Sequence, residues 1–158
     1  MILESPVFMQ NQPIPALYTC QGKDLSPPLK WSGVPQNAKS LALIVDDPDA
    51  PDPKAPKRTY VHWVMYNIPI TAQGLAEGAG NNPELLPPGT ALATNDWQKT
   101  GYGGPCPPIG QHRYFFKFYA LDRMIEHLPE PADKQALLKA MEGHILDQAE
   151  LIGVYQKD

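Results

Sequence analysis

The sequence is poor in cysteine and contains no long apolar run. Its 158 residues include two cysteines, Cys20 and Cys106, which are too few for a disulfide framework and lack the spacing of a structural zinc site. The longest apolar run, 41–45, is far too short to span a membrane, and residues 1–15 lack the basic and apolar regions of a signal peptide. We therefore expect a soluble, cytoplasmic protein without an integral membrane segment.

Positive charge is also scarce. The chain has 13 Lys and Arg against 17 Asp and Glu, a net charge of −4, and no basic stretch extends beyond Lys54–Arg58. This balance argues against a surface that follows the phosphates of a nucleic acid. No Gly-x-Ser-x-Gly nucleophile motif is present either, which argues against one large class of serine hydrolases.

Proline, by contrast, is abundant. The chain has 19 prolines, whereas an average share of roughly 5% would give about eight in a chain of this length. They are spread along the whole sequence, which is typical of many short elements joined by stiff loops rather than of a helical bundle. No linker or internal repeat divides the chain, so we predict a single domain over residues 1–158.

Hydrophobic patterns predict strands through most of the chain and one helix near its end. Asp133 is a suitable N-cap, and Leu137, Met141 and Ile145 recur at helical spacing, so we predict a helix from about 133 to 150. The predicted strands are Leu29–Trp31, Ser40–Val45, Tyr60–Asn67, a short one near Thr90–Ala93, Tyr114–Leu121 and Leu151–Gln156. The predicted fold is therefore mainly β: an antiparallel Greek-key β-sandwich with one C-terminal helix and long irregular loops.

Two of these strands carry polar residues in apolar surroundings. The continuous apolar run Ser40–Val45 predicts a strand that is buried on both faces and ends before Asp46 and Asp47. Alternation assigns the next strand two faces, with Tyr60, His62, Val64 and Tyr66 on one and Val61, Trp63, Met65 and Asn67 on the other. Residues 70–100 give little periodic signal, and an irregular excursion of that length is usually functional.

The stretch 101–114 is a loop of glycines and prolines that leads into the strand Tyr114–Leu121. Glycine lets the backbone approach a ligand closely, and proline fixes the loop around it, so the site is ordered before a ligand arrives. Alternation puts His112 and Tyr114 on one face and Arg113 on the other, where we expect it to pair with Asp47 or Asp49. An imidazole and a phenol side by side under a rigid loop are typical of a pocket wall.

Three motifs occur in order along the chain: Asp47-Pro48-Asp49-Ala50-Pro51, His62–Pro69 and Gly104–Tyr114. Together they resemble the phosphatidylethanolamine-binding protein family, most closely its small bacterial, Raf-kinase-inhibitor-like branch, and the resemblance covers nearly the whole chain. It implies an antiparallel β-sandwich with a small anion-binding pocket at one end, no cofactor and no established enzymatic activity.

The resemblance implies ligand-binding groups at Asp47, His62, His112 and Tyr114, with further donors from the backbone between Gly104 and Cys106. It assigns no role to the thiol of Cys106. Two imidazoles, a phenol and loop N–H groups suit a phosphate, a phospho-head group or a carboxylate. Asp47 is expected to accept a hydrogen bond from an imidazole or to pair with a ligand amine. We therefore predict a protein that holds a small anionic or zwitterionic ligand.

Other functions stay open. Asp47 with His62 or His112 could serve as the acid/base pair of a small-molecule hydrolase, the same residues could hold a metal ion, and the pocket rim could be presented to a regulatory protein partner. No nucleophile or tight ligand spacing accompanies them, so neither catalytic residues nor metal ligands are assigned. Homodimer formation through Leu85 and Leu86 is compatible with a small sandwich. The crowded turn at Ala50–Pro51 predicts a cis peptide bond.

Overall fold

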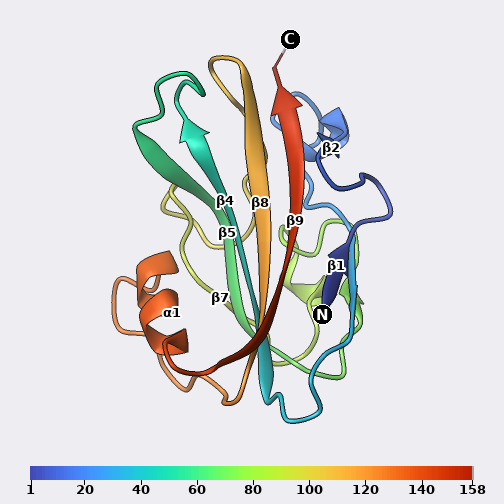
Figure 1. Cartoon of the computed structure of the whole chain (residues 1–158), viewed down its shortest axis with the longest axis vertical. Helices are drawn as coiled ribbons and strands as arrows, with labels where there is room; N and C mark the ends of the chain where they lie inside the picture. The colour runs from blue at the N-terminus through green and yellow to red at the C-terminus, as the bar shows by residue number, and fades with distance from the viewer. Residues whose placement is uncertain (158) are drawn as a thin grey trace.

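The computed structural model describes residues 1–157, which form two β-sheets and one α-helix. The larger sheet has the strand order β2-β9-β8-β4-β5-β7 (Figure 1). The smaller sheet has the order β1-β3-β6. The strands are β1 Ile2–Glu4, β2 Gln12–Pro13, β3 Leu29–Ser32, β4 Ser40–Ala50, β5 Arg58–Ile68, β6 Gly74–Leu75, β7 Ala91–Leu92, β8 Gln111–Leu121 and β9 Ile145–Gln156. The helices are α1 Lys134–Met141 and the short 3-10 turns η1 Ala16–Tyr18 and η2 Pro83–Leu85.

The pairing of these strands confirms the predicted mainly-β sandwich. All strand pairs are antiparallel except β2 with β9, and β8 returns beside β4 on the side opposite β5. In a Greek-key arrangement the fourth strand returns after a long connection and lies beside the first, as β8 lies beside β4. None of the helices within residues 1–157 has the length and apolarity needed to span a bilayer.

Strand β4 is buried on both faces, as its sequence predicts. Leu41, Leu43 and Val45 belong to the core between the two sheets, together with Trp31 of the smaller sheet. Ala42 and Ile44 face the other way, into a second core that includes Leu137 and Met141 of α1. Each fully buried aliphatic side chain contributes about 1.5–3 kcal/mol to the stability of the folded protein. Strand β4 therefore stabilises both cores.

The predicted end of this strand at Val45 is wrong. Strand β4 continues to Ala50, because Asp46 and Asp47 keep their backbone pairing with Val61 and Tyr60 of β5. Charged residues remain in this buried strand since each carboxylate has partners, as described below. The peptide bond between Ala50 and Pro51 is cis, as predicted.

A β-bulge in β5 overturns the predicted alternation of that strand. Val45 pairs with Trp63 and Asp46 with Val61, so His62 is an extra residue opposite a continuous partner strand. A bulge of this kind shifts the faces by one residue. His62 therefore shares a face with Trp63, which packs between the sheets, while Val61 packs into the second core.

The predicted helix is shorter than expected and the last strand is longer. Asp133 caps α1 as predicted, accepting a hydrogen bond of 3.0 Å from the amide of Ala136. The helix stops at Met141 because Gly143 adopts a left-handed conformation, with φ of +79°, that ends helices. Strand β9 then begins at Ile145 and pairs with β8 over its whole length.

Candidate functional site

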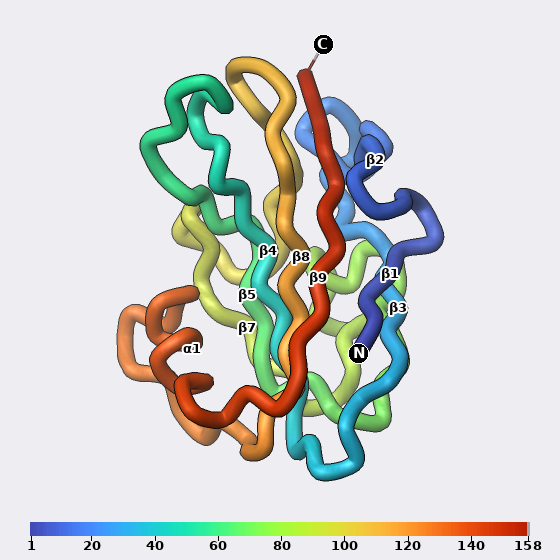
Figure 2. The backbone as a smooth tube through the Cα atoms, viewed as in Figure 1, coloured from blue at the N-terminus to red at the C-terminus, as the bar shows by residue number. Residues whose placement is uncertain are grey.

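A cavity of about 620 Å³ opens where the ends of β4, β5 and β8 meet. Figure 2 shows the hairpin loop between β4 and β5 and the loop before β8 at the same, upper end of the molecule. Of the six predicted site residues, five line this cavity: Asp47, His62, Cys106, His112 and Tyr114. The remaining lining residues are Ala50, Pro51, Lys57, Arg58, Tyr60, Trp97, Pro107 and Pro108.

Asp47 and His112 form a buried pair on one wall. The Nδ1 atom of His112 lies 2.6 Å from Oδ2 of Asp47, and the two side chains are 1% and 4% exposed. The other carboxylate oxygen, Oδ1, accepts a hydrogen bond of 2.7 Å from the amide of Asp49. The structure therefore gives Asp47 the imidazole partner that the sequence predicted.

The second ring nitrogen of His112 is also occupied. Nε2 lies 2.9 Å from the carbonyl oxygen of Ile109 and 3.1 Å from that of Pro51. All three partners of the ring are oxygen atoms of a carboxylate or a carbonyl, so both ring nitrogens are engaged within the protein. His112 thus holds two loops and a carboxylate together and offers no unused nitrogen.

A second carboxylate fixes this wall from behind. Asp49 accepts hydrogen bonds from the backbone amide of Arg113 at 2.9 Å and from Nε and Nη2 of its guanidinium at 3.0 and 2.9 Å. These hydrogen bonds from the side chain are the main reason that the pKa of Asp49 is lowered. The predicted partner of Arg113 is confirmed, and the clamp ties the end of β4 to the start of β8, where Asp47 and His112 meet.

His62 lies on the opposite wall and has a free ring nitrogen. Its Nδ1 donates a hydrogen bond of 2.7 Å to the carbonyl oxygen of Gly103, while the amide of Gly103 donates to the carbonyl of His62 at 3.0 Å. The imidazole is packed between the rings of Tyr60, Trp97 and Tyr114, at centroid distances of 5.4, 5.0 and 5.2 Å. Burial lowers the pKa of His62, against the opposing effects of the Gly103 carbonyl and nearby carboxylates.

Tyr114 completes the inner wall between the two histidines. Burial, reinforced by the charge of Asp47, raises its pKa far above the usual value, so the phenol stays protonated. Its ring stacks on that of His112, with centroids 6.4 Å apart. The predicted pair of imidazole and phenol on one face of β8 is present.

Gly104 does not reach the cavity. Its amide donates a hydrogen bond of 2.9 Å to Oδ1 of Asp24, and a Cβ atom at this position would lie 2.4 Å from the carbonyl oxygen of Tyr18. Pro105 has no N–H, and its carbonyl accepts from the amide of Cys20. The backbone of this stretch is therefore used mainly to attach the loop to residues 18–24.

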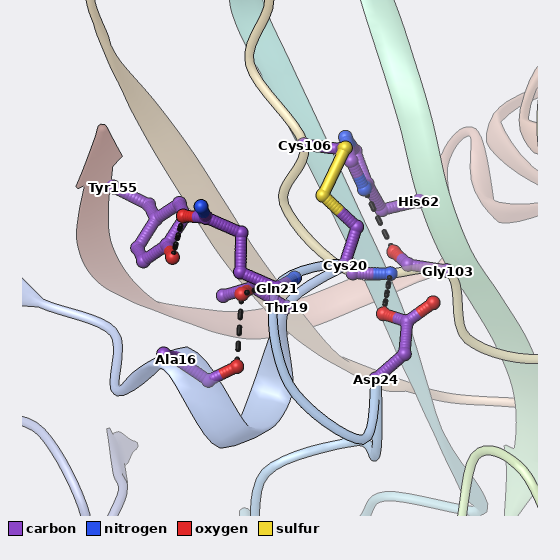
Figure 3. Close-up of a disulfide and its surroundings, with 10 residues drawn as sticks. Ala16, Thr19, Cys20, Gln21, Asp24, His62, Gly103, Cys106 and Tyr155 are labelled. Atoms are coloured by element: carbon purple, nitrogen blue, oxygen red, sulfur yellow. Dashed lines mark hydrogen bonds between the residues drawn. A yellow bond between two sulfur atoms is a disulfide. The ribbon is translucent and has the colours of Figure 1, made fainter. Parts of the chain in front are cut away.

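The sequence left the role of Cys106 open, and the structure shows that this residue forms a covalent cross-link. Cys106 forms a disulfide with Cys20, which joins the segment after η1 to the loop that leads into β8 (Figure 3). Both residues are exposed, and Cys106 lines the cavity. Because disulfides are rare in reducing compartments, the low cysteine content no longer supports the prediction of a cytoplasmic location.

Several residues at the rim were missed in the sequence. Trp97 is 39% exposed at the cavity and is held by Asn95, whose side-chain oxygen accepts from the amide of Trp97 at 2.9 Å. Arg58 lies over the ring of Tyr60 and pairs with Asp96 at 3.0 Å. Residues 94–101 show no periodic pattern of apolar residues, so only their position in a long loop indicated a functional role.

Within residues 1–157, no three His, Cys, Asp or Glu side chains are grouped so as to hold a metal ion. Asp47 and His112 satisfy one another, and His62 is bonded to a backbone carbonyl instead. The donor geometry therefore gives the metal-centre alternative no support.

Known proteins resemble this chain over its full length. A UPF0098 protein of Methanothermobacter thermautotrophicus is 49% identical over 159 aligned residues, which cover 99% of each chain. The structure of CT736 from Chlamydia trachomatis is 43% identical with a TM-score of 0.88, covering 99% of this chain and 97% of that one. Escherichia coli YbcL, described as a member of the mammalian PEBP family, is 31% identical with a TM-score of 0.88, covering 99% and 98%.

These relatives come from both archaea and bacteria, so they do not single out a bacterial branch. The family model for phosphatidylethanolamine-binding protein matches residues 4–156, which contain every residue of the site. The chain belongs to the phosphatidylethanolamine-binding protein family.

Proposed function

We propose that this protein binds a small anionic or zwitterionic ligand, with a phosphate or carboxylate group, in the cavity at the ends of β4, β5 and β8. Family membership suggests a ligand-binding protein. The observation that carries the proposal is a preformed cavity of about 620 Å³ in which a free imidazole nitrogen of His62 and the phenol of Tyr114 line the wall and two cations, Lys57 and Arg58, line the exposed edge.

Each group has a defined part in this proposal. Lys57 and Arg58 attract the anion and raise its local concentration. His62 and Tyr114 bind the head of the ligand inside the cavity, where low polarity strengthens a hydrogen bond. Asp47 keeps lone pairs on both carboxylate oxygens, so it can accept from an amine if the ligand is zwitterionic.

The same geometry favours binding over catalysis. A general base needs a ring nitrogen within reach of the substrate, but both nitrogens of His112 are engaged with Asp47, Pro51 and Ile109. His62 has no carboxylate on Nδ1 to activate it, since that position is bonded to the carbonyl of Gly103.

Ligand binding can be measured directly by titrating the protein with inorganic phosphate, O-phosphoethanolamine and acetate, following chemical shifts by NMR. Tyr114→Phe keeps the ring and removes one donor, so we expect about tenfold weaker phosphate binding, the value of one charge-assisted hydrogen bond of about 1.5 kcal/mol. The matched control is His144→Ala, because His144 pairs with Asp122 beyond the end of α1 and does not line the cavity. Absence of binding to all three ligands would contradict the proposed function.

A further inference from the structure

The two histidines of the cavity differ in what they can offer to an anion. Both ring nitrogens of His112 already lie within hydrogen-bond distance of oxygen atoms of Asp47, Pro51 and Ile109. His62 directs Nδ1 at the carbonyl of Gly103, and no group among residues 1–157 hydrogen bonds to its Nε2. Because a carbonyl oxygen can only accept, the hydrogen of a neutral His62 is on Nδ1, and Nε2 carries a lone pair.

The orientation of this ring is fixed by its surroundings. Gly103 is hydrogen bonded to the backbone of His62 itself, and Trp97 lies so close to Gly103 that a Cβ atom there would be 2.2 Å from the indole. Tyr60, Trp97 and Tyr114 surround the imidazole edge to face. The ring therefore cannot exchange its two nitrogens without breaking the Gly103 contact, and Nε2 remains the atom presented to the cavity.

An unprotonated Nε2 of His62 repels an anion in the cavity. A phosphate oxygen and an unprotonated Nε2 both carry lone pairs, so direct contact between them needs a hydrogen that the free site lacks. The geometry points to a cavity that binds its anion together with one proton, held between Nε2 of His62 and a ligand oxygen. This inference rests on the proposed function and adds the chemistry by which the same site selects its ligand.

The proton can come from two sources, and both give the same hydrogen bond between Nε2 of His62 and a ligand oxygen. A phosphodiester has no hydrogen of its own, so His62 must take the proton from solvent. A phosphomonoester can bring it as P–OH, because its second pKa is about 6. In both cases affinity falls as pH rises above the range in which the proton is available.

The other charged and titratable groups around His62 come from three strands and two loops. Carboxylates approach from β4 and from the loop after β7: Asp46, Asp47 and Asp96. Neighbouring groups on β5, β8 and the hairpin include Lys57, Arg58, Tyr60, His112 and Tyr114. The pKa values of Tyr60 and Tyr114 are raised, mainly by burial, so neither phenol ionises near neutral pH.

The test compares dimethyl phosphate and methyl phosphate, with dissociation constants measured by NMR titration between pH 6 and pH 9. For dimethyl phosphate, which has no titratable group in this range, we expect Kd to rise by about tenfold per pH unit at the alkaline end, the slope for uptake of one proton. Tighter binding of methyl phosphate than of dimethyl phosphate near pH 6 would assign the proton to the ligand, and equal binding would assign it to His62; both support the inference.

His62→Gln provides the matched variant, because its amide keeps a hydrogen donor that never titrates. We expect this variant to bind dimethyl phosphate with a Kd that does not change with pH, while His144→Gln keeps the wild-type slope. A Kd of the wild-type protein that is constant with pH, or a slope that persists in His62→Gln, would overturn the inference while leaving the proposed function intact. Absence of binding at every pH would overturn both.

A measurement on the ligand-free protein tests the inference without any ligand titration. Nitrogen chemical shifts of the imidazole at pH 8 should identify a His62 protonated on Nδ1 and unprotonated on Nε2. The opposite tautomer would mean that the free site already presents a donor, and no proton uptake would be needed.

Discussion

Asp46 and Asp47 are adjacent in β4 and both are buried, yet their side chains lie on opposite faces of the sheet. Asp46, 1% exposed, is covered on the α1 side, where its Oδ2 accepts from Lys134 at 2.7 Å and Lys117 at 3.1 Å. Asp47, 3% exposed, lies on the side of the smaller sheet and is bonded to His112 at the cavity wall. The same residue type is therefore enclosed by packed elements on one face of the sheet and lines a cavity on the other.

The largest difference between the two faces is covalent, since the disulfide joins loops only on the cavity side. Cys20 and Cys106 are 86 residues apart, and closing a loop of this size raises the free energy of the unfolded chain by about 4.5 kcal/mol, through lost conformational entropy. We expect reduction, or the double substitution of both cysteines by Ala, to lower the free energy of unfolding by about that amount in urea titrations. A loss below about 1 kcal/mol would indicate that the hydrogen bonds of Tyr102, Gly103 and Gly104 already hold the loop.

The next prediction concerns Asp46, on the α1 side, where a substitution should change stability far more than ligand binding. Asp46→Asn leaves Lys117 and Lys134 without their anion, so we expect a loss of about 3 kcal/mol, typical of breaking a buried ion pair. Phosphate affinity should change much less than stability, because Asp46 does not line the cavity and acts on His62 only through its charge. Asp122→Asn, which alters an exposed ion pair with His144, is the control and should shift stability by no more than about 0.5 kcal/mol.

Asp47→Asn should give the opposite pattern on the cavity side. The hydrogen bond to His112 loses its negative partner, which we expect to lower stability by about 2 kcal/mol, within the range for hydrogen bonds to charged groups. Affinity for O-phosphoethanolamine should fall more than affinity for inorganic phosphate, because only the former carries an amine. Equal losses for the two ligands would argue against a contact between Asp47 and the ligand amine.

The smallest effect concerns pH and distinguishes His62 from the carboxylates. Burial holds the pKa of His62 below its ordinary value of about 6.5. Between that value and the lower folded value, the unfolded chain binds a proton that the folded protein does not, so stability falls as pH decreases through this window. His62→Gln should lose less stability than the wild-type protein between pH 7 and pH 5 in urea titrations. A wild-type curve parallel to that of the variant would show that His62 titrates normally.

Much of the fold could be predicted because the apolar runs are long and belong to central strands. Ser40–Val45 was predicted to be buried on both faces, and the two cores on either side of it confirm that. The end of β4 could not be predicted, since Asp46 and Asp47 look like a loop until their partners Lys117, Lys134 and His112 are known. The helix was overextended because Ile145 happens to fall at helical spacing, and Gly143 ends the helix before it.

Five of the six predicted site residues come together at the cavity and Gly104 does not, and the chemistry of the site was predicted less well. Motifs identified Asp47, His62, His112 and Tyr114, all of which line the cavity. A sequence does not reveal which nitrogen of a histidine is used, so His112 and His62 looked equivalent although only His62 has a free one. The disulfide was missed for a related reason, because two cysteines 86 residues apart carry no signal that their loops lie side by side.

The bulge at His62 has a consequence for insertions and deletions. The bulge leaves Trp63 in the core between the sheets and Val61 in the second core, with Val61 opposite Asp46 and Tyr60 opposite Asp47. A chain without that extra residue would keep Trp63 opposite Val45 and Val61 opposite Asp46 in an uninterrupted ladder. Tyr60 would still face the cavity, but the imidazole beside it would be missing. The imidazole of this wall therefore depends on one additional residue in β5, so a relative with one residue fewer at this point would keep the fold and lose the His62 part of the wall.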